Sequence, residues 1–195
     1  MSNLFEAPDD DATPLTAEEQ RDLIPSYIAF RRELNAAEQE NIARGRAWAF
    51  ARRRDLLTEK FLFELHRRML GDVWRWAGKI RTTERNIGVV PWQIPVELRI
   101  LLDDAKVWTE RRPLPPDEIA LRFHHRLVAI HPFPNGNGRH ARLLADLFIA
   151  RLGGLPFSWG RANLTDPGAM RGAYISALKA ADGHDIGPLI AFARA

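Results

Sequence analysis

Apolar side chains recur every three or four residues along most of this chain, the spacing that places them on one face of an α-helix. Residues that favour helix boundaries flank several of these runs: Asn35 and Thr58 can cap a start, Gly71 can end a helix, and Pro95 suits a first turn. Gly45 weakens the first of them, because glycine is a poor helix former. The pattern predicts helices over residues 35–54, 59–70, 95–108, 117–130, 139–152, 167–181 and 188–194.

Residues 72–92 break the helical period. The stretch 73–83 is aromatic and β-branched, and a second short apolar stretch follows at 86–90. Both compositions favour strands, so we predict a small β-hairpin with its bend near residues 84–86. Two short strands are marginal alone, so the hairpin should lie against the helices as a flap. The predicted fold class is all-α with this one hairpin, whose site residues are Thr82, Thr83, Ile87, Gly88 and Val89.

Composition supports a single domain. The chain has 195 residues, 46% of them hydrophobic, which is enough for one sizeable core. Residues 1–13 are acidic and read as a mobile tail, so the predicted domain covers residues 14–195. There is no cysteine, which excludes disulfides, thiolate metal sites and a cysteine nucleophile. We see neither a signal peptide nor an apolar stretch of membrane-spanning length, and expect a soluble cytoplasmic protein without membrane contact.

The charge of the chain leaves one further class open. The net charge is only +3, but the sequence pI is about 9.7. Short arginine clusters lie at residues 52–54, 67–68 and 111–112. Such clusters would suit nucleic acid, although short ones are more often solvated helix ends. We favour the helix ends and keep nucleic-acid binding as an alternative.

The candidate chemistry lies between two predicted helices, at residues 131–142. His131 follows the first helix and carries a side chain that titrates near neutral pH. Gly136 and Gly138 flank Asn137, which suits a turn with outward-facing N–H groups at the start of the next helix, where phosphates bind readily. Arg139 and Arg142 are three residues apart, and therefore lie on one helix face. A base, an anion nest and two arginines together indicate phosphate chemistry.

This segment resembles the signature of the Fic family, also called Fic/Doc or Fido: His-x-Phe-x-Asp/Glu-Gly-Asn-Gly-Arg-x-x-Arg. Every fixed position matches except Asn135. The resemblance implies a helical core with the motif between two helices and a flap beside it. It implies adenylyl transfer from ATP to a Ser, Thr or Tyr hydroxyl of a target protein, with His131 as the base. The flap would hold the target as an added strand. The nucleotide phosphates would be bound by Gly136, Asn137, Gly138, Arg139 and Arg142, and Phe133 would anchor the turn.

Asn135 is the departure from the family pattern. The family has Asp or Glu there to hold Mg²⁺ against the nucleotide. An amide oxygen is a weaker ligand for a hard cation because it carries no charge. Weaker adenylyl transfer, a different phosphate transfer, and nucleotide binding without turnover all stay open, and we place adenylyl transfer first.

Two further expectations come from the resemblance. Many family members carry an inhibitory helix whose Glu pairs with the second motif arginine. Glu33 is in register with that residue and would pair with Arg142, although an ordinary surface glutamate explains it as well. The chain is also similar to small stand-alone bacterial Fic proteins of the toxin-like "mobile mystery protein B" type. That likeness implies a helix-turn-helix, antitoxin-like partner.

Overall fold

The computed structural model describes residues 15–160 and 167–195. The segment predicted to be a tail, residues 1–13, lies outside this part. The described helices are α1 (Ala17–Asp22), α2 (Arg31–Phe50), α3 (Glu59–Leu70), α4 (Ile94–Arg111), α5 (Pro116–Ile130), α6 (Asn137–Arg151), α7 (Pro167–Asp182) and α8 (Gly187–Arg194), with a 3₁₀ turn, η1 (Pro91–Gln93), before α4. The predicted all-α class is confirmed.

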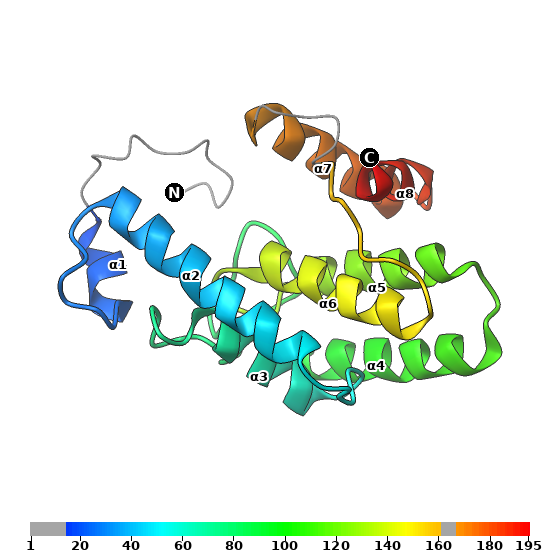
Figure 1. The fold of residues 1–195 in the computed structure, drawn as a ribbon, viewed down its shortest axis with the longest axis horizontal. Coiled ribbons are helices and arrows are strands. Elements are labelled where there is room, and N and C mark those ends of the chain that lie inside the picture. The colour runs from blue at the N-terminus through cyan, green and yellow to red at the C-terminus, as the bar shows by residue number, and fades with distance from the viewer. Residues whose placement is uncertain (1–14, 161–166) are drawn as a thin grey trace.

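The helices pack around the pair formed by α5 and α6. Helix α4 lies antiparallel to α5, α2 packs on α3 and crosses α6, and α7 and α8 form a pair over α5 (Figure 1). One buried apolar cluster connects these helices. Phe123 of α5 meets Phe148 of α6 edge-on at 5.2 Å between ring centroids, with both rings buried. The two helices that flank residues 131–136 are therefore fixed by core packing, and they hold the ends of that turn. Within the described residues, no helix has the combined length and apolar character that a membrane crossing needs.

Helix α2 differs from its prediction at its start. It begins at Arg31 rather than at Asn35, because the Glu33 carboxylate accepts hydrogen bonds from the N–H groups of Ala29 (2.8 Å) and Phe30 (3.2 Å). A glutamate at the third helical position often closes a helix start in this way.

Gly45 does not interrupt α2. A Cβ at this position would lie 2.9 Å from the Arg68 carbonyl oxygen and 2.9 Å from the Met69 Cα. The glycine therefore permits α2 and α3 to cross at close range, and its helix-weakening effect is offset by that packing.

The predicted β-hairpin is wrong: residues 82–90, here called the flap segment, form bends without a strand. The stretch expected as its first strand is paired elsewhere. The Ile24 N–H donates to the Val73 carbonyl (2.8 Å) and the Arg75 N–H to the Asp22 carbonyl (2.9 Å), forming an isolated bridge with the chain next to α1. With these groups occupied, residues 73–75 are not available to residues 86–90.

The flap segment is held by other contacts. The Arg81 N–H donates to the Pro132 carbonyl (3.0 Å), and the Val89 N–H to the Ile130 carbonyl (3.4 Å). Both ends of the segment thus lie along the chain that leaves α5. The flap is positioned beside the motif, as expected, but through pairing with residues 130–132 rather than with itself.

Candidate active site at the turn between α5 and α6

The turn formed by residues 131–138, here called the motif turn, begins at His131. This residue has a left-handed backbone (φ 54°, ψ 59°) and closes α5 by donating its N–H to the Leu127 carbonyl (3.2 Å). Such a conformation is rare for a residue with a Cβ and costs roughly 1 kcal/mol or more, so the surrounding contacts must enforce it. The side chain is buried, with 5% exposed.

Burial is the main reason that the pKa of His131 is lowered to about 4. The nearby Val128 carbonyl opposes the shift, and the positive charges of Arg81 and Arg85 add to it. The imidazole is therefore neutral at physiological pH. Its Nδ1 is buried. A proton from a substrate therefore reaches the ring at Nε2.

Asn137 closes the motif turn. Its side-chain oxygen accepts from the Phe133 N–H (2.9 Å) and its amide nitrogen donates to the Phe133 carbonyl (2.8 Å). Phe133 is fully buried and stacks on His66, with ring centroids 3.7 Å apart. Phe133 thus anchors the motif turn to α3 through His66. The buried side chain of Asn137 shapes the turn instead of facing a ligand.

The two motif glycines have different surroundings. Gly136 has a φ of 78°, and a Cβ there would lie 2.5 Å from Leu70 Cδ1, so this glycine is needed for the turn itself. A Cβ at Gly138 would meet nothing within 4 Å. The start of α6 is therefore open at Gly138, where the first helical N–H groups have no partner within the helix. Together with the helix dipole, this opening suits an anion.

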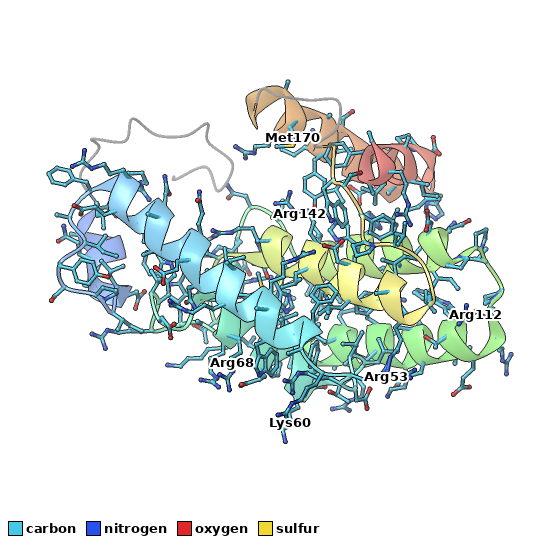
Figure 2. All side chains as sticks on the ribbon, viewed as in Figure 1. Arg53, Lys60, Arg68, Arg112, Arg142 and Met170 are labelled. Carbon is cyan, nitrogen blue, oxygen red and sulfur yellow. The ribbon has the colours of Figure 1, made fainter. Side chains whose placement is uncertain are left out.

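The two motif arginines lead to different neighbours. Arg139 forms a 2.5 Å ion pair with Glu38 of α2. Arg142 donates from Nε to the Gly138 carbonyl (3.4 Å) and lies over the ring of Tyr174 of α7 at 5.4 Å. Figure 2 shows Arg142 between α6 and α7. The open end of α6 is thus flanked by one guanidinium on the side of α2 and one on the side of α7.

Two site residues escaped the sequence analysis. Glu38 is buried and accepts from Trp74 Nε1 (2.6 Å) in addition to its ion pair with Arg139. His66 of α3 accepts the Gly78 N–H at Nδ1 (2.8 Å), so its proton is on Nε2, which donates to the Asn135 carbonyl (3.0 Å). Burial, followed by the neighbouring His140, lowers the pKa of His66 well below its usual value, in keeping with the neutral ring. His66 could have been found in the sequence, because it is a polar residue within the apolar face of a predicted helix.

Glu33, predicted as an inhibitory residue, caps the start of α2 and is partly exposed. Its two backbone hydrogen bonds, first that from Ala29, lower the pKa of its carboxyl. This local role accounts for Glu33 without an inhibitory contact, and its pairing with Arg142 stays a prediction.

The residues at the motif turn fit Mg²⁺ poorly. The side-chain oxygen of Asn135 already accepts the Gly136 N–H (2.6 Å). Across the described parts of the chain, no three His, Cys, Asp or Glu side chains lie close enough together to hold one metal ion. Magnesium in phosphate-transfer sites is commonly held by one or two carboxylates, and the motif turn supplies none.

Comparisons with known proteins agree with this arrangement. The profile of the Fic/DOC family matches residues 56–149, from the segment before α3 into α6. "Protein adenylyltransferase Fic" of Drosophila grimshawi is 34% identical over 140 residues, covering 70% of this chain and 28% of the relative. "Protein adenylyltransferase fic-1" of Caenorhabditis elegans is 34% identical over 139 residues, covering 67% of this chain and 25% of the relative. The chain thus spans about a quarter of the length of these curated relatives.

Solved structures show the same fold. Residues 134–508 of C. elegans Fic-1 superpose with a TM-score of 0.58 at 29% identity, covering 80% of this chain and 47% of that one. BepC of Bartonella tribocorum, solved with bound AMPPNP, has a TM-score of 0.67 at 17% identity, covering 92% of this chain and 97% of that one. The chain belongs to the Fic/DOC family. The narrower likeness to stand-alone proteins of mobile elements stays a prediction.

Proposed function

We propose that this chain transfers AMP from ATP to a hydroxyl group of a target protein. Its curated relatives are named protein adenylyltransferases. The observation that carries the proposal is the open start of α6 at Gly138, next to two arginines and a buried neutral histidine. BepC, which shares the fold, was solved with an ATP analogue.

In the proposed reaction, the target hydroxyl oxygen attacks the α-phosphorus, and the bond from that phosphorus to pyrophosphate breaks. The hydroxyl proton passes to His131 Nε2, and pyrophosphate leaves. Negative charge on the phosphoryl oxygens would be stabilised by the N–H groups at the start of α6 and by Arg139 and Arg142. A histidine with a pKa of about 4 is a weak base, so it accepts the proton as attack makes the hydroxyl acidic.

The flap segment is the proposed contact for the target. Thr82, Thr83, Ile87 and Gly88 are exposed and Val89 is half-buried, so a target segment can reach them. Because the flap segment is not a strand, strand addition would require it to straighten on binding.

Nucleotide labelling tests the proposal. The chain is incubated with lysate and ATP labelled on either the α- or the γ-phosphate, with His131→Ala alongside and, as a histidine control away from the motif turn, His125→Ala, whose side chain pairs with Asp182 of α7. Transfer of AMP predicts labelling above that of lysate alone from α-labelled ATP only, abolished in His131→Ala and retained in His125→Ala. Labelling from the γ-phosphate that appears only when the chain is added and is lost in His131→Ala would instead show phosphate transfer and contradict the proposal.

A nucleotide-binding module without turnover is the second candidate, favoured by the missing carboxylate at Asn135. It predicts calorimetric binding of ATP with no labelled protein from either phosphate. Nucleic-acid binding is less well supported, since Arg67 and Arg68 both pair with Glu64. Arg68 also lies on the side of the molecule away from Arg142 (Figure 2).

A further inference from the structure

Among the residues that the structure describes, Arg81 is the largest buried polar side chain, with 2% exposed. Its Nε donates to the His131 carbonyl (2.6 Å), Nη1 to the Thr83 carbonyl (2.9 Å) and Nη2 to the Val89 carbonyl. None of the ion pairs in the described parts of the chain uses this guanidinium, so neutral carbonyl groups take the place of a counter-ion. Burying a charge in this way is costly unless its hydrogen bonds are all made.

These bonds join both ends of the flap segment to the motif turn. The carbonyls of Thr83 and Val89 are the two ends of the flap segment, and the third carbonyl belongs to the proposed base. Arg81 Nε is fixed to a residue with a strained left-handed backbone, the kind of conformation that needs external support. A guanidinium is suited to this task, because its planar donors point in fixed, separate directions.

Gly88 shows how closely the flap segment approaches. Its φ is 105°, and a Cβ there would lie 2.6 Å from His131 Cβ and 2.7 Å from Arg81 Nη2. The flap segment therefore contacts both the Arg81 guanidinium and the Cβ of His131 at Gly88. A single added methyl group at this position would push them apart.

We propose that Arg81 is a positioning residue for His131: its guanidinium fixes the His131 backbone and keeps the flap segment packed over the imidazole stem. This inference rests on the proposed function for its kinetic consequence, but its structural content is independent of it. The charged groups that act on the His131 ring are Arg81 and Arg85, both on the chain that covers it, while α5 contributes the Val128 carbonyl. Arg85 is exposed and is the matched control, because it supplies charge without a bond to His131.

The experiment measures the His131 pKa by NMR and single-turnover AMP transfer in full-length Arg81→Met, Arg81→Lys and Arg85→Met. Arg81→Met removes the hydrogen bond to the His131 carbonyl, so water should reach the imidazole. The pKa of His131 should then rise from about 4 towards 6.5, and the rise in Arg85→Met should be smaller. We expect kcat to fall about a hundredfold in Arg81→Met with little change in KM, since small misplacements cost that much. Arg81→Lys keeps the charge but cannot span three carbonyls, so it should resemble Arg81→Met.

Three results would each overturn the inference. Equal pKa shifts in Arg81→Met and Arg85→Met, or wild-type behaviour of Arg81→Lys, would show that charge alone matters. If Arg81→Met does not fold, Gly88→Ala decides, because it displaces the flap segment while keeping the guanidinium. A wild-type His131 pKa in that variant would also contradict the role. Should the wild-type chain transfer no AMP, the proposed function fails, while the NMR comparison still decides the role of Arg81.

Discussion

The motif turn, which begins at His131, and the flap segment, which packs against that residue, are held in different ways. The motif turn is closed locally: Asn137 bonds to Phe133, four residues earlier. The flap segment depends on distant residues, with Arg81 reaching the His131 carbonyl across 50 positions. The motif turn therefore has hydrogen bonds that close it within its own sequence, with His66 as a distant support, whereas the flap segment is tied to the rest of the fold by Arg81. This difference predicts which substitutions lower AMP transfer directly, which disturb the shape of the motif turn, and which do neither.

His131→Ala should have the largest effect. The variant lacks the only titratable side chain that the proposed mechanism uses, so AMP transfer should fall by roughly 10²–10⁴-fold, as for other general bases. Nucleotide affinity should stay within several-fold of wild type, because the start of α6 is unchanged. Single-turnover labelling and calorimetry measure the two quantities. A wild-type transfer rate would show that His131 is not the base.

Asn137→Ala should come next, through the shape of the motif turn. It leaves the buried N–H and carbonyl of Phe133 without partners, which costs about 1–3 kcal/mol for each unsatisfied group. We expect a lower midpoint of urea unfolding and at least a tenfold loss of transfer.

The matched change in the flap segment is Asn86→Ala, at an exposed position. Surface substitutions of this kind usually change stability by no more than about 0.5 kcal/mol. Equal losses of stability in the two variants would contradict the distinction between a locally closed turn and a segment held from outside.

The same distinction explains what the sequence could predict. The helices follow from apolar periodicity, and the motif turn from Gly136, Asn137 and His131, because each depends on near neighbours. The hairpin prediction was wrong because the stretch expected as its first strand pairs with the chain around Leu23 instead. No local pattern in the sequence indicates that pairing. Glu38 escaped for the same reason, since its partners Trp74 and Arg139 lie on other elements.

Asn135→Asp tests the motif turn with a metal. An aspartate can accept the Gly136 N–H as Asn135 does, and it adds the charge that a hard cation prefers. We expect ATP affinity in the variant to rise roughly tenfold when Mg²⁺ is added, the size of one charge-assisted contact. The wild-type chain should respond less. Calorimetry with and without Mg²⁺ makes the comparison, and an unchanged metal response would mean that residue 135 is not a ligand.

The smallest effects should come from the two glutamates of α2, which separate a local role from a distant one. Glu38 holds Arg139 in a partly buried ion pair, so a nucleotide phosphate must compete with it for the guanidinium. Glu38→Gln still offers an oxygen to Trp74 Nε1 but no charge to Arg139, and should raise ATP affinity by several-fold, in line with an ion pair of about 1 kcal/mol.

Glu33→Gln weakens the start of α2 and should leave ATP affinity unchanged. Because the folded-state pKa of Glu33 is lowered, its contribution to stability is present above the ordinary pKa of 4.5 and is lost as pH falls through the folded-state pKa. The stability difference between wild type and Glu33→Gln should therefore shrink on acidification. A rise in ATP affinity or self-labelling in Glu33→Gln, with none in Glu38→Gln, would reverse this assignment and support the inhibitory pairing of Glu33 with Arg142.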